Sequence, residues 1–388
     1  MDFTLPKHLQ LFKEMVKEFA ETEVRPKAKK MDAEGWPDPD VVRKLGENGL
    51  LGIPFPTKYG GGGLGEMGYC LLMETMGGIC TSTATLIGAH IGIGVMALYL
   101  GGNEEQKKKY LPDLCNGRKI AAFCLTEPGA GSDAAGIKTR AIKDGNSWVI
   151  TGNKIYITNG PIADVFTVLA VNDPSLGARG GVTAFIVEKN MPGVAVGTVE
   201  HKMGIRGSAT SEMIFDEVVV PSANVLGQVG AGFVTFMATL DTGRLGLGAA
   251  CLGGAEAALE SMCQYAAGRQ QFGKPIAEKQ AIQWMIADTA AEVEALRSMV
   301  YRTAWMVDTN QPYTKEAGIC KLFGSEVASR AINRAVQVHG AMGYTRDFWI
   351  ERAWRDARIA EIFEGTNEIQ RIVIAEQMLR PYGVRVRP

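Results

Sequence analysis

The chain has 388 residues, of which 46% are hydrophobic and 21% charged, and its formal net charge at pH 7 is −1. This length is enough for two or three domains with large cores. A nearly neutral chain lacks the basic face that phosphate backbones require, which excludes nucleic acid as the main partner.

The composition also bears on membranes, compartment and metals. No apolar run approaches the roughly 18 residues that span a bilayer, so no membrane-spanning helix is expected. The first residues, Met1–His8, resemble neither a signal peptide nor an Arg- and Ser-rich transit peptide, which favours the cytoplasm. The seven cysteines are scattered and never spaced as Cys-x-x-Cys, which predicts free thiols in a reducing compartment. No His-Glu-x-x-His pattern is present, so no metal is expected.

The first part of the chain, residues 1–118, has a helical pattern. Apolar residues recur at helical spacing between Leu9 and Phe19, with Lys and Glu between them. The glycine run Tyr59–Gly63 is expected to be a flexible connection, because no Gly-Lys-Ser/Thr follows it and no strand pattern precedes it. Residues 73–100 are rich in small and apolar side chains, which predicts a pair of buried helices.

The second part, residues 119–226, is dominated by β-branched segments that Gly, Asn, Asp and Pro separate. The predicted strands lie within Ala141–Ile150 (two strands joined by an Asp-Gly turn), Lys154–Asn159, Val165–Ala170, Thr183–Val187 and Glu212–Val220. No helical pattern lies between them, which excludes a βαβ nucleotide-binding layer. We expect a compact antiparallel β-domain between two helical domains.

The third part, residues 227–388, is helical again. A long apolar stripe runs from Ile282 to Val300. The Gly-x-Gly within Leu240–Gly248 lies in a helical pattern and follows no strand, so its glycines are expected to permit close helix packing rather than to hold a dinucleotide. Several helices of this kind predict a C-terminal four-helix bundle in a mainly α protein.

Two helical patterns meet near the C-terminus at a Glu-Gly-Thr-Asn break that contains Glu364. Two apolar residues precede this glutamate, so its carboxyl is expected to lie against apolar surface, where desolvation raises the pKa. Gly365 permits a tight turn close to a ligand, and Thr366 or Asn367 can cap the next helix. The residues leave two interpretations open: a catalytic corner with Glu364 as base, or a helix–turn–helix joint with a solvated glutamate.

A second stretch, Phe123–Asp133, contains Pro128-Gly-Ala-Gly131, which cannot form regular structure. Its glycines expose consecutive backbone N–H groups, and such a concavity suits a phosphate or a polarised ring edge. Thr126 and Ser132 add hydroxyl groups beside an apolar wall. The alternative is an ordinary loop of the β-domain in which the Asp133 carboxylate has its own hydrogen-bond partners.

The two stretches together resemble the acyl-CoA dehydrogenase family of flavoenzymes, and the resemblance extends from about Phe3 to about Arg380. It implies the family's α–β–α architecture with a C-terminal four-helix bundle. Residues 1–118 would form the N-terminal helical domain and residues 119–226 the middle β-domain, with flavin and thioester contacts. Residues 227–388 would form the C-terminal helical domain, with the catalytic base and the oligomer interface.

The resemblance implies FAD as the cofactor. The positions expected to contact it are Phe123, Leu125, Thr126, Ser132, Tyr156, Thr158, Arg269, Phe272, Gln280, Gln337, Gly340, Ala341, Thr366 and Glu368. Arg269 and Phe272 would meet the FAD of a neighbouring subunit, and guanidinium and amide groups suit a pyrophosphate. The chain departs from the commoner pattern at Tyr156, where relatives carry Trp, but an aromatic face is kept.

The resemblance also implies a substrate and a reaction. Glu364 would take the α-proton of an acyl-CoA while the β-hydrogen leaves as hydride to the flavin, and electrons would pass to an electron-transferring flavoprotein. Some relatives carry the base at the position of Gly243, so Glu364 has no competitor here. A homotetramer is implied as well. The positions expected to contact the substrate are Ser132, Asp241, Arg244 and Gly365.

Alternatives on the same fold are an acyl-CoA oxidase and a decarboxylating dehydrogenase. The decarboxylating glutaryl type places an Arg near Cys80–Thr83, where this chain has none. A non-enzymatic flavin-binding protein is a third alternative, and the intact Glu364 argues against it. The acyl group is not defined by the sequence, although small residues around Thr85–His90 suit a short, branched or cyclic group.

Overall fold

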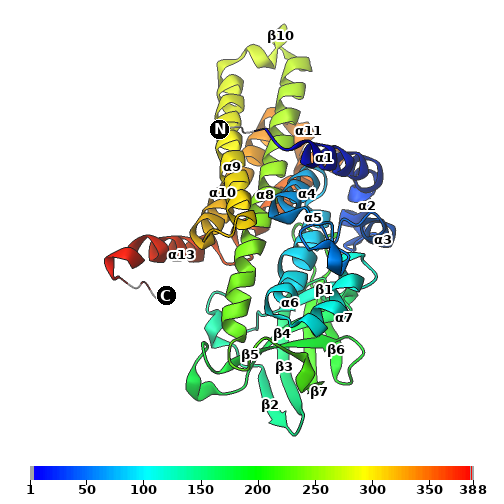
Figure 1. Ribbon diagram of the computed structural model, residues 1–388. Helices are drawn as coiled ribbons and strands as arrows, with labels where there is room; N and C mark the ends of the chain where they lie inside the picture. The colour runs from blue at the N-terminus through cyan, green and yellow to red at the C-terminus, as the bar shows by residue number, and fades with distance from the viewer. Residues whose placement is uncertain (1–3, 385, 387–388) are drawn as a thin grey trace.

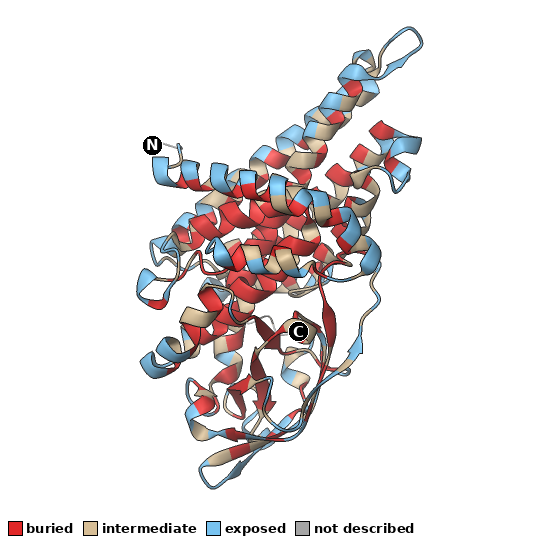
Figure 2. Cartoon of the chain, turned by 90° about the vertical axis from the view of Figure 1, so that its right-hand side faces the viewer, coloured by how far each residue is buried: buried red, intermediate tan, exposed pale blue. Residues whose placement is uncertain are grey.

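The computed structural model describes residues 4–384 and 386, and it consists of an N-terminal group of helices, a β-sheet and a long C-terminal helical bundle (Figure 1). One helix of 37 residues, α8 (Gly232–Gly268), runs from the sheet through the middle of the molecule to a distant tip. Buried residues are concentrated where the helices cross α8 and in the sheet, whereas the tip is largely exposed (Figure 2).

The N-terminal helices form from local signals. Asp38 accepts hydrogen bonds from the N–H groups of Asp40 and Val41 at the start of one helix. Asn103 and Gln106 form a capping box at the start of another. The elements are α1 (Lys7–Phe19), η1 (Ala20–Val24), α2 (Arg25–Glu34), α3 (Pro39–Glu47), η2 (Thr57–Tyr59), α4 (Gly65–Ile79), α5 (Thr81–Ile87), η3 (Gly88–Val95), α6 (Met96–Gly101) and α7 (Glu104–Cys115).

The segment Thr81–Gly101, which joins α5, the π-helical η3 and α6, corrects one expectation. By length and composition it could cross a membrane, with a mean hydropathy of 1.6. The prediction that no segment reaches this length is wrong, because Gly, Ser, Thr and His interrupt the apolar run without adding formal charge. Within the protein 72% of its apolar window is buried, so packing against neighbouring helices accounts for its composition.

The middle of the chain forms an eight-stranded sheet with the order β6-β7-β3-β2-β4-β5-β8, in which β1 also pairs with β4. Most neighbouring strands are antiparallel, as predicted. However, β1 pairs in parallel with β4, with Ala121 opposite Val165, so the sheet is mixed. The strands are β1 (Ala121–Cys124), β2 (Arg140–Asp144), β3 (Ser147–Thr158), β4 (Val165–Val171), β5 (Val182–Glu188), β6 (Val194–Val199), β7 (Thr210–Pro221) and β8 (Val225–Leu226).

Short helical turns connect the strands: η4 (Ala134–Gly136), η5 (Gly160–Ile162), η6 (Pro174–Leu176) and η7 (Ser222–Asn224). A buried histidine joins the sheet to the N-terminal helices. The N–H of Ala121 donates to His90 Nδ1 at 3.0 Å, so Nε2 carries the proton and donates to the carbonyl of Leu114 at 3.0 Å. Burial lowers the pKa of His90 to about 4, which keeps the ring neutral.

The C-terminal part packs α8 against two further long helices, α9 and α10, and the shorter α12 and α13 extend from α10. In Figure 1, α13 projects away from the body of the molecule. The remaining elements are β9 (Gln270–Gln271), β10 (Lys274–Pro275), η8 (Ile276–Glu278), α9 (Gln280–Asp308), α10 (Thr314–His339), α11 (Ala341–Tyr344), α12 (Trp349–Ala357), η9 (Arg358–Glu361), α13 (Asn367–Leu379) and η10 (Arg380–Tyr382).

Candidate active site

Glu364 lies in the turn between η9 and α13 with a backbone φ of 54°, and Gly365 follows with a φ of 87°. The residue is half-buried, but its Oε2 atom is buried and has no hydrogen-bond partner in the described chain. Burial raises the pKa of this carboxyl to about 7, against the opposing charges of Arg244 and Lys321. The predicted apolar setting is therefore confirmed. A buried carboxyl that titrates near neutrality is suited to act as a general base.

The turn is held by the helix that follows it, α13. Thr366 caps α13 by accepting a hydrogen bond from the N–H of Ile369 at 3.3 Å, as predicted. Gln370 Nε2 donates to the carbonyls of Glu364 and Gly365, each at 3.2 Å. These bonds offset the strain of a non-glycine residue in the left-handed region.

Gly243 of α8 lies directly against the Glu364 carboxyl. A Cβ atom at this glycine would come within 2.7 Å of Glu364 Oε2 and 2.8 Å of Ile93 Cγ2. Any side chain here would therefore displace the carboxyl. The resemblance places the base at position 364 or, in some relatives, at position 243, and these two positions lie next to each other. Because residue 243 is a glycine here, the space beside it is occupied by the Glu364 carboxyl.

A buried ion pair lies next to the turn. Arg244 Nη1 donates to Asp241 Oδ1 at 2.8 Å, and both residues are buried. Thr314 donates to the other oxygen of Asp241 at 2.6 Å. Burial raises the pKa of Asp241, although Thr314 and Arg244 oppose the shift. Arg244 Nε also reaches the Glu364 carbonyl at 3.4 Å, so the structure brings these two sequence-predicted residues beside Glu364.

Sequence reasoning missed a buried lysine that supports the same turn. Lys321 of α10 is fully buried, and its Nζ donates to Asn367 Oδ1 at 2.8 Å. Ser325 Oγ donates to the same oxygen at 3.1 Å. Burial lowers the pKa of Lys321 to about 8, opposed by Cys251 and Glu364. Asn367 is the first residue of α13, so Lys321 fixes the helix that follows Glu364. The sequence signal that could have predicted the burial of Lys321 is its helical spacing from small buried residues of α10.

The residues predicted on the flavin side lie in or just after the last residues of β1 and β3. Phe123 and Leu125 are buried, and the Phe123 ring stacks on Phe236 with a centroid distance of 4.1 Å. The Thr126 carbonyl accepts a hydrogen bond from Ile155 at 2.9 Å, which places the loop beside β3.

A bulge in β3 exposes the predicted aromatic face. The register with β7 shifts between Lys154 and Ile157, and within this interval Tyr156 has a φ of 56° and is 62% exposed. Thr158 follows at the end of the strand and is half-buried. The bulge therefore turns the Tyr156 ring outward, where it is available to a ligand.

The helix segment η3 connects the base to this edge. Ile93 lies beside the point where Gly243 meets Glu364, as described above. The next residue, Gly94, packs against β1, and a Cβ there would be 2.9 Å from Ala121 Cβ. Glu364 and the first strand of the β-domain therefore lie on either side of one short segment.

A second feature missed by sequence reasoning is a buried ion pair under the loop. Lys154 Nζ lies 2.8 Å from Glu127 Oε1 and donates to the Leu125 carbonyl at 3.0 Å. Glu127 also accepts from the N–H groups of Lys138 and Thr139, at 2.6 and 2.9 Å. Burial raises the pKa of Glu127, but Lys154 and these donors outweigh it, and the net pKa is lowered. The pair ties the first part of the Phe123–Asp133 loop to β3 and to the segment that follows the loop.

The loop has the chemistry that a flavin nucleotide requires. The hydroxyls of Thr126, Ser132 and Thr158 have no hydrogen-bond partner within residues 4–384 and 386. A Cβ added at Gly129 or Gly131 would meet no atom within 4 Å. Free hydroxyls and open glycine backbone beside the apolar Phe123 and Leu125 therefore fit a polarised ring edge or a phosphate.

Arg269, Phe272 and Gln280 lie elsewhere, at the exposed tip formed by β9, β10 and the start of α9 (Figure 1). Phe272 is 92% exposed. Gly268 lies 25 residues after Gly243 along α8, which corresponds to about 38 Å. The structure does not bring the tip to Glu364 of the same chain.

Gln337, Gly340 and Ala341 are also distant and exposed, at the junction of α10 and α11. Gln337 lies 16 residues beyond Lys321 along α10, about 24 Å away. By contrast, Glu368 is exposed in the first turn of α13 beside Thr366 and therefore stays close to Glu364.

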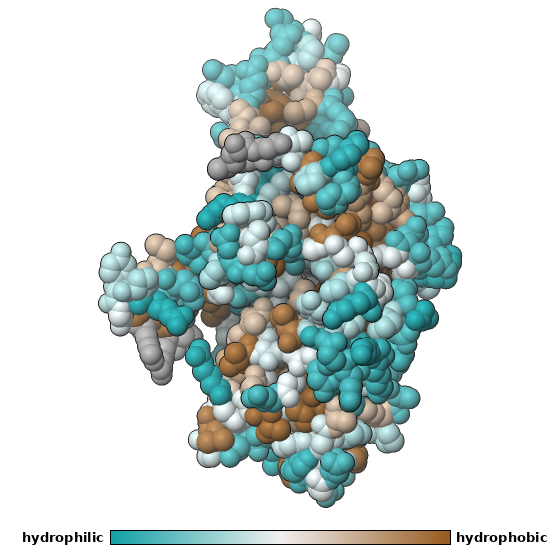
Figure 3. Space-filling view, viewed as in Figure 1, coloured by the Kyte–Doolittle hydropathy of each residue, from teal (hydrophilic) through white to brown (hydrophobic). Residues whose placement is uncertain are grey.

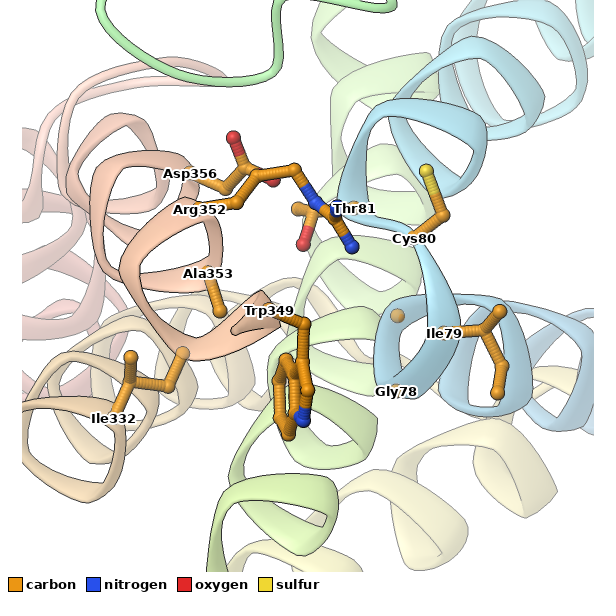
Figure 4. A pocket seen from close by; sticks show the side chains of 11 residues that line it. Gly78, Ile79, Cys80, Thr81, Ile332, Trp349, Arg352, Ala353 and Asp356 are labelled. Carbon is orange, nitrogen blue, oxygen red and sulfur yellow. The ribbon is translucent and has the colours of Figure 1, made fainter. Parts of the chain in front are cut away.

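Glu364 lines neither of two cavities. The smaller, about 20 Å³, lies between the α4–α5 turn and α12, with Arg352 and Asp356 on one side and Cys80 and Thr81 on the other (Figure 4). It has room for a single water molecule. The larger, about 300 Å³, is lined by Ser329, Arg330, Asn333, Trp354, Ala357, Arg358 and Glu361.

All seven cysteines are free thiols. In the portion of the chain described, no three His, Cys, Asp or Glu side chains are grouped to hold a metal ion.

An α–β–α fold with a buried carboxyl and an open glycine loop beside free hydroxyls fits a flavin-dependent oxidoreductase. Three family models match in order: the acyl-CoA dehydrogenase N-terminal domain at residues 6–118, the middle domain at 122–218 and the C-terminal domain at 230–379. The chain belongs to the acyl-CoA dehydrogenase family, and it is an FAD-dependent oxidoreductase that acts on acyl-CoA.

Individual relatives agree over nearly the full length. The chain is 45% identical over 380 residues to a probable acyl-CoA dehydrogenase of Bacillus subtilis, covering 98% of this chain and 100% of the relative. Butyryl-CoA dehydrogenase from Megasphaera elsdenii superposes with a TM-score of 0.96 at 40% identity, covering 98% and 100%. A chain from the electron transferring flavoprotein structure of Acidaminococcus fermentans superposes with a TM-score of 0.96 at 42% identity, covering 98% and 100%.

Proposed function

We propose that the protein catalyses the FAD-dependent α,β-dehydrogenation of a short-chain acyl-CoA thioester to the 2-enoyl-CoA, with Glu364 as the base. The observation that carries this proposal is the buried, unpartnered Oε2 of Glu364, whose pKa is raised to about 7. We also propose the division into residues 1–118, 119–226 and 227–388, which the three family matches support. A cytoplasmic location stays a prediction.

In this mechanism Glu364 accepts the α-proton at Oε2. FAD, when bound, would supply the redox chemistry as the acceptor of the β-hydrogen and its electron pair. The backbone N–H of Glu364 has no partner in the described structure and is available to donate to the thioester carbonyl, which polarises the α C–H bond. Arg244 and Gln370 hold the Glu364 carbonyl and so fix the peptide group between Glu364 and Gly365, directly after the base. Thr126, Ser132, Tyr156 and Thr158 would hold the flavin.

The substrate and the electron acceptor follow from the relatives. Similarity to a butyryl-CoA dehydrogenase supports a short acyl group. Similarity to a chain from an electron transferring flavoprotein structure supports such a flavoprotein as the electron acceptor. Asp241, Arg244, Ser132 and Gly365 are proposed to contact the acyl-CoA. Decarboxylation is disfavoured because Cys80–Thr83 contains no Arg.

The test is an anaerobic titration of the purified protein with a panel of acyl-CoAs. We expect a yellow protein with non-covalent FAD, whose flavin absorbance bleaches on addition of butyryl-CoA. A colourless protein that takes up no FAD would contradict the cofactor. An FAD-loaded protein that no acyl-CoA bleaches would contradict the reaction. Rapid reoxidation by oxygen would favour an oxidase instead.

We further propose a homotetramer in which the tip of one chain contacts the FAD of another. The distance along α8 supports this, because Arg269 cannot reach the flavin loop of its own chain. Large apolar side chains on the C-terminal helices also support it, since their exposure is typical of protein interfaces. Patches of apolar surface interrupt the hydrophilic face in Figure 3. The most exposed of these side chains are Trp284, Tyr344 and Tyr382, and Phe272 in the turn between β9 and β10 is more exposed still.

The expected mass by light scattering is about four times the 41.8 kDa of one chain. Arg269→Ala is expected to weaken FAD binding by about 10- to 100-fold, because a hydrogen bond to a charged group contributes about 1.5–3 kcal/mol. Lys274→Ala removes a charge from the same hairpin and serves as the control. A single-chain mass with FAD bound would contradict the proposal.

The pH dependence of the reaction follows from the Glu364 pKa. The carboxyl accepts a proton only when ionised, so kcat/KM is expected to rise with pH through about 7. Lys321→Met removes a charge that favours the ionised form and should move the midpoint upward. Lys315→Met, on the same helix, is the control and should leave it unchanged. A midpoint near 4.5 in the parent would instead indicate a solvated glutamate.

A further inference from the structure

Tyr69 of α4 carries a hydroxyl group that the proposed chemistry does not use. Its side chain is fully buried, and Oη has no hydrogen-bond partner in the described part of the chain. Burial, with the Glu364 charge adding to it, raises the pKa well above its usual value, so the phenol is neutral. A buried unpaired hydroxyl costs about 1–3 kcal/mol. A phenylalanine would avoid that cost, so the position calls for an explanation.

Glycines from two other elements make room for this ring. A Cβ at Gly92 of η3 or at Gly246 of α8 would lie 2.4 Å from Tyr69 Oη. A Cβ at Gly88 would lie 3.7 Å from the same atom. Side chains at Gly92 or Gly246 would therefore displace the phenol. The end of the ring is inserted into a seam that these glycines form between η3 and α8.

The same seam holds the catalytic carboxyl. Gly243 and Gly246 are one turn apart on α8, and side-chain positions three residues apart on a helix lie about 5–6 Å from each other. Glu364 Oε2 lies against the first glycine and Tyr69 Oη against the second. On the other side of the seam, Ile93 lies by Gly243, and a Cβ at Gly92 would be 3.5 Å from Gly243 Cα. Two buried, unpartnered oxygens thus lie on neighbouring turns of one seam.

Apart from the side that the buried Lys321 of α10 occupies, three directions lead away from the Glu364 carboxyl. The Asp241–Arg244 pair and its contact with the Glu364 carbonyl occupy the first. The packing of Gly94 on β1 leads to the flavin loop in the second. The seam toward Tyr69 is the third. Because the base must meet the α-carbon and the flavin the β-carbon, the rest of an acyl chain is left with the direction toward Tyr69.

We propose that Tyr69 is a specificity-determining residue that closes the acyl end of the site and restricts the substrate to short acyl groups. This rests on the proposed function and names a residue that sets its substrate class. The ring occupies the space that a longer chain would need. The hydroxyl adds to the discrimination, because methylene groups placed against it leave it unpaired.

The test compares butyryl-CoA with octanoyl-CoA in the FAD-loaded parent and in Tyr69→Ala, Tyr69→Leu and Tyr69→Phe. The parent is expected to prefer butyryl-CoA. Tyr69→Ala should raise the octanoyl-to-butyryl ratio of kcat/KM by about 10-fold or more, since one methylene in an apolar pocket is worth about 10- to 200-fold. Tyr69→Leu opens less space and should raise the ratio less. Tyr69→Phe keeps the ring and should keep most of the preference.

Tyr110→Phe is the control, because that buried phenol donates to Glu188 at 2.7 Å in another part of the molecule. It should leave the ratio unchanged. An unchanged ratio in FAD-loaded Tyr69→Ala and Tyr69→Leu would overturn the proposal, as would a parent that reduces its flavin equally well with octanoyl-CoA. Both results leave the dehydrogenase function standing. That function fails separately, if neither thioester bleaches the parent flavin.

Discussion

Replacement of Glu364 by Gln is expected to slow flavin reduction by about 10²–10⁴-fold while FAD content and acyl-CoA binding are retained. The amide has nearly the same volume and still forms hydrogen bonds, but it cannot accept the α-proton. The bonds from Arg244 and Gln370 go to the backbone carbonyl of Glu364, so the turn should keep its shape. Stopped-flow absorbance measures the reduction, and the spectral shift on adding acyl-CoA measures binding.

Glu361→Gln, three residues earlier in η9, is the matched control and should reduce its flavin at the parent rate. Stability offers a second readout. The raised pKa of Glu364 means that the folded state loses stability as pH rises from the ordinary glutamate value through about 7. Glu364→Gln should therefore unfold at higher urea than the parent above pH 7 and at the same urea below pH 4.5. A parental reduction rate in the variant would assign the base to another carboxylate.

The turn around Glu364 was predictable because its determinants are local. Apolar neighbours, a glycine and a capping threonine lie within a few residues, and the structure confirms a buried oxygen and a cap at Thr366. The irregular structure of the Phe123–Asp133 loop was predictable for the same reason, since the composition of Pro128–Gly131 excludes a helix or a long strand. Most predicted strands also follow from a local pattern of β-branched residues and turns.

The residues that sequence reasoning missed act over long distances along the chain. Lys321 bonds to Asn367 across 46 residues, and Lys154 pairs with Glu127 across 27. A lysine side chain is expected to be exposed unless a buried partner is known. No sequence pattern identified Asn367 as the partner of Lys321 or Glu127 as the partner of Lys154. The parallel pairing of β1 was missed because a strand of four residues has too short a pattern to show its direction.

Tyr69 shows a similar limit. Its ring fills a space defined by glycines of η3 and α8, and the Gly-x-Gly pattern in α8 predicted close helix packing without naming the side chain that uses it. The apolar segment Thr81–Gly101 shows the reverse case, since its composition fits either a membrane or a protein core. The observation that favours a protein core is structural: 72% of the apolar window of this segment is buried inside the protein.

Loss of the ion pair between Glu127 and Lys154 is expected to have the second large effect. Glu127→Gln leaves the Lys154 charge buried without a counter-charge, and breaking such a pair costs about 3–5 kcal/mol. The variant should unfold at lower urea. It should also lose FAD, because Glu127 fixes the flavin loop to the N–H groups of Lys138 and Thr139. Asp113→Asn, which breaks an exposed pair with Arg118, should cost about 1 kcal/mol or less.

The double variant Glu127→Gln/Lys154→Met distinguishes the cost of an unpaired buried charge from the loss of the bonds that position the loop. With both charges removed, no unpaired ion is left in the core, so the double variant should be more stable than the sum of the single losses implies. The amide introduced by Glu127→Gln still accepts a bond from one of the two loop N–H groups, so part of the FAD content should return. If the losses are additive and FAD binding is unchanged in Glu127→Gln, the pair does not position the loop. The flavin site would then depend on the pairing of β1 with β4 and of β3 with β7 alone.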